Sequence, residues 1–121
     1  MEGRPQTRTE PDFDPMAIAI DWLDACRARD LGRLLGLYDP SASLCCTCSG
    51  DILGGIAQLR QYWTDRLAAA VPAAFELNEI TPSGDRIVLD YASFEGKPVR
   101  TEFEFSRSGK IAATRCEPAR S

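Results

Sequence analysis

Cysteine is the residue type that first suggests chemistry in this chain of 121 residues. Cys45, Cys46 and Cys48 lie in the run CCTC, and Cys26 and Cys116 are far from it in sequence. A structural zinc site needs four ligands, and all four would be thiolates here because the chain contains no histidine. The run also lacks paired C-x-x-C spacing. We therefore expect no metal and no other cofactor, and we interpret the cysteines as small buried hydrophobic residues.

The missing histidine also limits catalysis. It excludes histidine acid–base chemistry and the Ser–His and Cys–His pairs that activate nucleophiles. Asp90 is then the main catalytic candidate, because a carboxylate on a mostly apolar strand would be desolvated and its pKa raised. In the alternative, Asp90 faces outward and pairs with an arginine. Cys46 is a second candidate, a nucleophile only as a thiolate, and a thiol sensor using Cys46 and Cys48 is a third hypothesis.

The charge balance excludes other classes of function. With 14 Lys and Arg against 18 Asp and Glu, the net charge is -4, which does not suit nucleic-acid binding. No apolar run is long enough to span a bilayer, so we expect no membrane contact. Residues 1–13 are polar and contain proline, which indicates a disordered tail without a signal peptide and predicts a cytoplasmic protein with reduced thiols.

The pattern of the remaining chain predicts a single α+β domain over residues 14–118. Asp14-Pro15 and Asp30 are typical helix starts, for helices over 16–29 and from 31 to about 38. A third helix is expected over 56–70, and strands over 42–48, 75–81, 86–94, 99–105 and 110–117. The strand 99–105 alternates strictly, so Val99, Thr101 and Phe103 should face a core. The strand 86–94 is largely apolar on both faces, which predicts cover on both sides.

Three segments resemble one known superfamily. They are DACRARDLGRLLGLYDPSASLCC, GGIAQLRQYWTDRL and FEFSRSGKIAATRCEP. Over about residues 15–118 the chain resembles the nuclear transport factor 2-like (NTF2-like) superfamily, nearest to the SnoaL-like polyketide cyclases and ketosteroid isomerases. The resemblance implies a cone-shaped roll, in which a curved, mostly antiparallel sheet and three N-terminal helices enclose a hollow.

The resemblance also implies positions for the catalytic groups. Where ketosteroid isomerases carry an oxyanion-hole tyrosine, a general-base aspartate and a protonated aspartate, this chain has Trp22, Cys46 and Thr101. The isomerase machinery is therefore absent, and the dehydratases of this superfamily rely on histidine. The same placement turns several more side chains toward the hollow as expected ligand contacts, namely Cys26, Val88, Ala92, Phe103, Thr114 and Cys116, with Asp90 beside them.

Two functions remain open from the sequence. The first is a domain that binds a small hydrophobic or carbonyl-bearing molecule in the hollow, with an isomerase, cyclase or lyase activity and no cofactor. The second is a non-catalytic ligand-binding or dimerisation module whose hollow is filled by side chains. In both, we expect a homodimer formed through the outer face of the sheet.

Overall fold

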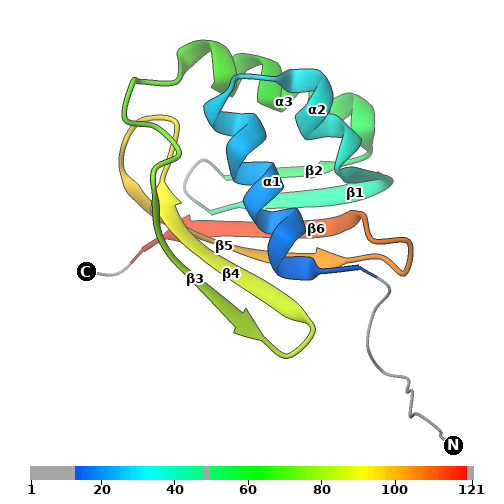
Figure 1. Ribbon diagram of the computed structural model, residues 1–121. Coiled ribbons are helices and arrows are strands. Elements are labelled where there is room, and N and C mark those ends of the chain that lie inside the picture. Colours follow the sequence, from blue (N-terminus) through cyan, green and yellow to red (C-terminus); the bar gives the residue numbers. More distant parts are fainter. Residues whose placement is uncertain (1–12, 48–49, 120–121) are drawn as a thin grey trace, which may run out of the picture.

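The computed structural model describes residues 13–47 and 50–119, which fold as three helices and a six-stranded sheet. The elements in chain order are α1 (Pro15–Arg27), α2 (Leu31–Gly36), β1 (Tyr38–Cys46), β2 (Asp51–Gly54), α3 (Ile56–Ala69), β3 (Leu77–Ser83), β4 (Arg86–Ala92), β5 (Pro98–Phe105) and β6 (Ile111–Pro118). Figure 1 shows the helices packed together over one face of a curved sheet. The predicted α+β fold is confirmed. Residues 1–12, where most of the expected tail falls, lie outside the described residues.

Both predicted helix starts are confirmed by side-chain caps. The Asp14 carboxylate accepts hydrogen bonds from the backbone N–H groups of Met16 (3.1 Å) and Ala17 (3.4 Å), and Pro15 occupies the first turn, where its missing N–H costs nothing. Asp30 caps α2 through the N–H of Arg33 at 3.1 Å. Short polar side chains before an apolar stripe therefore fixed where these helices begin.

The predicted end of the second helix is wrong. α2 stops at Gly36, and β1 already begins at Tyr38, which is paired with Ile111 of β6. The register shifts between Tyr38 and Ser43, and Pro40, which has no N–H to donate, falls in this irregular stretch. The helical spacing of Tyr38 was misleading because the side chain is buried by tertiary contacts with β6 and the helices.

The sheet has the strand order β2-β1-β6-β5-β4-β3. β1 and β6 pair in parallel, and every other neighbouring pair is antiparallel. The short edge strand β2 was not predicted, because four residues give too little alternation to recognise. This order places the ends of the chain's first and last strands, β1 and β6, side by side.

The two faces of β4 differ clearly. Ile87, Leu89 and Tyr91 are buried against the helices, whereas Val88, Asp90 and Ala92 lie on the other face and are only partly buried. The expectation that Asp90, Val88 and Ala92 face the hollow is therefore wrong. Both faces of this strand are rich in apolar residues, and α1 packs on the face that carries Tyr91.

A group of rings, called here the aromatic core, fills the space between α1 and the middle of the sheet. The indole of Trp22 lies within 5.0–5.5 Å, centroid to centroid, of the rings of Phe103, Trp63 and Tyr91, all edge-on. The indole N–H groups of Trp22 and Trp63 both donate to the Tyr38 hydroxyl oxygen, at 3.0 and 3.2 Å. Both buried indole N–H groups therefore have a partner within the aromatic core, where Trp22 and Phe103 are at most 1 % exposed.

None of the helices in the described residues is both long and apolar enough to cross a membrane.

Candidate functional site

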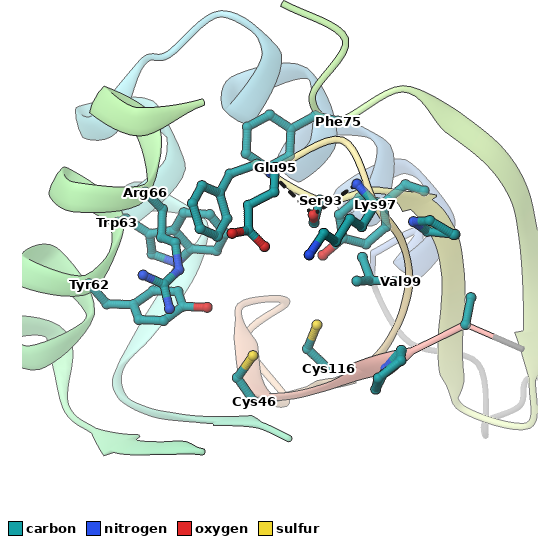
Figure 2. A pocket seen from close by; sticks show the side chains of 15 residues that line it. Cys46, Tyr62, Trp63, Arg66, Phe75, Ser93, Glu95, Lys97, Val99 and Cys116 are labelled. Atoms are coloured by element: carbon teal, nitrogen blue, oxygen red, sulfur yellow. Dashed lines mark hydrogen bonds between the residues drawn. The ribbon is translucent and has the colours of Figure 1, made fainter. Parts of the chain in front are cut away.

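A cavity of about 610 Å³ opens beside the aromatic core, between α3, the β4–β5 hairpin and the ends of β1 and β6. Figure 2 shows this cavity from close by. Its lining is mostly apolar and rich in aromatic rings, and consists of Cys46, Tyr62, Trp63, Arg66, Phe75, Tyr91, Ser93, Phe94, Glu95, Lys97, Pro98, Val99, Cys116, Pro118 and Ala119. Volumes of about 300–1,000 Å³ are typical of small-molecule sites. The structure therefore provides room for a small ligand.

Arg66 and Tyr62 form the polar side of the cavity. They are one helical turn apart on α3, and the Arg66 guanidinium lies over the Tyr62 ring at 4.4 Å and over the Phe94 ring at 4.7 Å. The Arg66 guanidinium also makes a 3.1 Å salt bridge with the carboxylate of Asp51. Two aromatic faces and one carboxylate therefore hold this cation in place at the edge of the cavity.

The Tyr62 hydroxyl is a neutral hydrogen-bond donor. Burial raises the pKa of Tyr62 well above its ordinary value, and the negative charge of a Cys46 thiolate would raise it further, although Arg66 opposes both effects. Desolvation penalises the phenolate more than the phenol. The group that Tyr62 presents to the cavity is therefore an O–H, next to a permanent cation.

Tyr91 provides a second hydroxyl, held from behind by Thr101. Their oxygens are 2.9 Å apart in the buried sheet face, and burial raises the pKa of Tyr91 far above its ordinary value. Thr101 was expected to contact a ligand itself. It is 2 % exposed and does not line the cavity, so it acts by positioning Tyr91.

The mouth of the cavity is formed by the hairpin between β4 and β5. The Ser93 hydroxyl accepts hydrogen bonds from the backbone N–H groups of Glu95 (3.2 Å) and Lys97 (3.3 Å), which fixes the turn. Figure 2 shows the carboxylate of Glu95 and the amine of Lys97 directed into the cavity opposite the two cysteine side chains. The turn therefore supplies one acidic and one basic group.

Two of the predicted site residues line the cavity. Cys46 and Cys116 lie on neighbouring strands, and Figure 2 shows both sulfur atoms directed into the space. Other predicted ligand contacts belong to the packed interior instead: Trp22, Cys26, Phe103 and Thr114 are at most 6 % exposed and do not line the cavity. Burial raises the pKa of the Cys26 thiol well above its ordinary value, so Cys26 behaves as a core residue.

Asp90 lies away from the cavity, on the outer face of the sheet. Its carboxylate accepts two hydrogen bonds from the guanidinium of Arg100, its partner across β5, at 2.7 and 3.0 Å. The carboxylate side chain is 17 % exposed. This is the alternative that the sequence left open, an outward aspartate paired with an arginine, and it places Val88 and Ala92 outside as well.

Several lining residues were not predicted from the sequence, namely Arg66, Tyr91, Phe75 and the hairpin residues. One signal was available: Tyr62 and Arg66 are four residues apart in a predicted helix, so an aromatic and a cationic side chain had to share a face. Phe75 had no such signal. It adopts a left-handed backbone conformation (φ 65°) after α3, before β3 begins, and only the folded chain shows that its ring reaches the cavity.

The part of the chain that the structure describes contains no cluster of three or more Cys, Asp or Glu side chains arranged to hold a metal ion. Cys48 lies outside the described residues.

Comparisons with known proteins identify the fold. No protein-family model matches the chain, and no curated protein matches its sequence. Among solved structures, a SnoaL-like protein of unknown function from Burkholderia thailandensis superposes with a TM-score of 0.79 at 20% identity, covering 88% of this chain and 95% of that one. The chain has the NTF2-like fold.

Two further structures support the same fold. An NTF2-like protein of unknown function from Burkholderia xenovorans superposes with a TM-score of 0.69 at 22% identity, covering 88% of this chain and 85% of that one. A putative polyketide cyclase from Sinorhizobium meliloti also gives 0.69, at 24% identity, covering 86% of this chain and 99% of that one. These structures confirm the predicted fold.

Proposed function

We propose that this NTF2-like domain binds a small, largely apolar molecule that carries a carbonyl group. The observation that supports this most is the cavity of about 610 Å³, whose aromatic walls end at the Tyr62 hydroxyl and the Arg66 guanidinium. Aromatic walls provide the apolar contact area, and a few convergent donors fix the orientation, as in most small-molecule sites. The carbonyl oxygen would accept hydrogen bonds from Tyr62 and Arg66.

This arrangement suits reactions that begin by removing a proton next to a carbonyl. A neutral phenol and a guanidinium at the oxygen stabilise the negative charge that develops when the α-carbon loses a proton. Glu95 contributes a carboxylate to the same lining, and we assign it the role of proton acceptor in place of Asp90. The reaction would be an isomerisation, cyclisation or elimination without a cofactor, a class that includes the activity suggested for the similar Sinorhizobium protein.

Displacement of a fluorescent apolar probe tests the binding step. We expect 8-anilinonaphthalene-1-sulfonate to bind the cavity and 2-acetylnaphthalene, an aryl ketone, to displace it. Tyr62→Phe and Arg66→Met should each lower the affinity for the ketone by about tenfold, which is the effect of losing one hydrogen bond to a buried carbonyl. The hydrocarbon 2-ethylnaphthalene should bind both variants and the wild type equally. Equal ketone affinity in all three proteins would overturn the assignment of Tyr62 and Arg66.

Non-catalytic function is the second candidate, and the aromatic core favours it. Trp22, Trp63, Tyr91 and Phe103 occupy the centre of the interior, which leaves the cavity to one side. A binding module would show probe displacement without turnover. Deuterium exchange at the methyl α-carbon of 2-acetylnaphthalene distinguishes the two: exchange that depends on Glu95 indicates an enzyme, and binding without exchange indicates a module.

We also propose that the domain forms a homodimer through the outer face of the sheet. This face bears cross-strand ion pairs, Arg86 with Glu102 and Glu104, and Arg100 with Asp90, around the half-buried Val88. A two-fold axis brings the same face of both protomers together, so the half-buried Val88 of one copy would be covered by its partner. Sedimentation equilibrium of the wild type and of Val88→Arg tests it: the wild type should be dimeric and the variant monomeric. A wild-type monomer would overturn it.

A further inference from the structure

Cys46 and Cys116 lie directly opposite each other at the base of the cavity. β1 and β6 are parallel neighbours, and the two residues are partners in their register. Adjacent strands are about 4.8 Å apart, and opposite residues project to the same face. Figure 2 shows both sulfur atoms on the cavity side. The sheet therefore presents two thiols at one level, with a spacing that suits simultaneous bonding to one atom.

The backbone holds this pair rigidly. Thr47, next to Cys46, donates its N–H (2.9 Å) and its hydroxyl (3.1 Å) to the carbonyl oxygen of Cys116. Gly50 donates its N–H to the carbonyl oxygen of Cys46 at 2.7 Å. The two bonds from Thr47 join the end of β1 to β6 and oppose a slip of register there. A ligand that needs both thiols would therefore find them already positioned and would lose little entropy on ordering them.

The pair is flanked by a cation and by apolar walls. The Arg66 guanidinium interacts electrostatically with Cys46, and the Tyr62 hydroxyl lies beside both groups. The remaining volume is bounded by aromatic rings, among them Trp63, Phe75 and Tyr91. An atom held by the two sulfurs would therefore have space beside it for an apolar group.

We infer that Cys46 and Cys116 form a two-thiol site for a soft, thiophilic centre that carries one apolar substituent, with monosubstituted trivalent arsenicals as the ligand class. Thiolates are soft ligands and select soft centres. The reaction with phenylarsonous acid is balanced without a redox step. Two As–O bonds break and two As–S bonds form, the two thiol protons leave with the hydroxides as two water molecules, and arsenic stays trivalent.

The test uses the full-length chain reduced with a phosphine, because a dithiol reductant would compete for arsenic. Phenylarsonous acid should form a one-to-one adduct with the wild type, measured by native mass spectrometry. Cys46→Ser and Cys116→Ser should each lose about 100-fold or more in affinity, since the second bond of a bidentate ligand is intramolecular. An unchanged affinity in either variant would overturn the inference.

Other cysteines of the chain provide matched controls. Cys45 lies on the opposite face of β1, paired with the exposed Ile52, and Cys26 is buried in the core. Cys45→Ser, Cys26→Ser and Cys48→Ser should all keep the wild-type affinity. If Cys48→Ser or Cys45→Ser abolished the adduct, the site would belong to the CCTC run and the inference would be wrong.

A protection measurement on the wild type tests the inference without any variant, so its result does not depend on whether the variants fold. Bound phenylarsonous acid should protect Cys46 and Cys116 from N-ethylmaleimide, as mapped by peptide mass spectrometry, while the labelling of Cys45 stays unchanged.

Methylarsonous acid should bind more weakly than the phenyl compound, and equal affinities would exclude the aromatic cavity as the site. Failure of arsenical binding while the ketone still displaces the fluorescent probe would refute this inference alone and leave the proposed function standing.

Discussion

The interior of this domain has two halves built from the same elements, and they are used differently. In the aromatic core, the Tyr38 hydroxyl accepts hydrogen bonds from the N–H groups of Trp22 and Trp63, and Trp22 is only 1 % exposed. A short distance along α3, Tyr62 and Arg66 border a cavity of about 610 Å³. The polar atoms of the aromatic core are paired inside the packed interior, whereas Tyr62 and Arg66 interact with their neighbours on the wall of a cavity, where a ligand can also reach them.

The largest expected effect is on the packed half. Trp22→Ala should lower the free energy of unfolding by about 3–5 kcal/mol, because it leaves a large void among rings that cannot collapse onto it. Urea unfolding followed by circular dichroism measures it. A change below about 1 kcal/mol, the range of a surface substitution, would show that the two halves are not different in packing.

The next effect concerns hydrogen bonding within that half. Tyr38→Phe should lower the free energy of unfolding by about 1–3 kcal/mol, since the two indole N–H groups lose their shared buried acceptor. Tyr62→Phe is the matched control, because it removes the same oxygen from the edge of the cavity and should cost less. Equal losses in the two variants would contradict the comparison.

Alkaline pH should unfold the protein through its buried tyrosines. Burial raises the pKa values of Tyr38, Tyr62 and Tyr91 above the ordinary 10.0. The unfolded chain then loses phenolic protons before the folded chain does, so the contribution of these tyrosines to stability is fully present below pH 10 and decreases as pH rises further. Thermal unfolding between pH 8 and 11 measures the slope. Tyr91→Phe should make the decrease of stability with pH less steep. A slope identical to that of the wild type would contradict the assignment of this decrease to the buried tyrosines.

A smaller effect is expected at the cavity edge. Arg66→Met should change the free energy of unfolding by no more than about 1 kcal/mol, because its ion pair with Asp51 is partly exposed. The same variant should bind the ketone measurably more weakly in the displacement experiment. A strongly destabilised Arg66→Met protein would mean that this residue belongs to the packed half.

The smallest effect is expected on the outer face. Asp90→Asn should leave ketone affinity and any α-carbon exchange at wild-type values, because Asp90 is paired with Arg100 on the other side of the sheet. The same displacement and exchange measurements test it. A loss of exchange in this variant would restore Asp90 to the mechanism and overturn the role given to Glu95.

Individual residues show how much of the site could be predicted from the sequence. The alternation of β5 correctly placed Val99, Thr101 and Phe103 inside, because its other face carries charges. The same reasoning failed for Asp90, because both faces of β4 are rich in apolar residues and only the packing of α1 chooses between them. Cys46 and Cys116 were both expected inside, but their pairing needed the parallel register of β1 and β6.

The sequence by itself determined the helix starts at Asp14 and Asp30, the class of the fold, and the exclusion of histidine chemistry, because caps, alternation and composition are local properties. Tertiary structure alone decided which aromatic rings fill the interior and which border a cavity. It also brought Arg66, Phe94 and the two thiols together from four separate elements or turns. Such contacts depend on how elements distant in sequence pack, and no local pattern of residues encodes that packing.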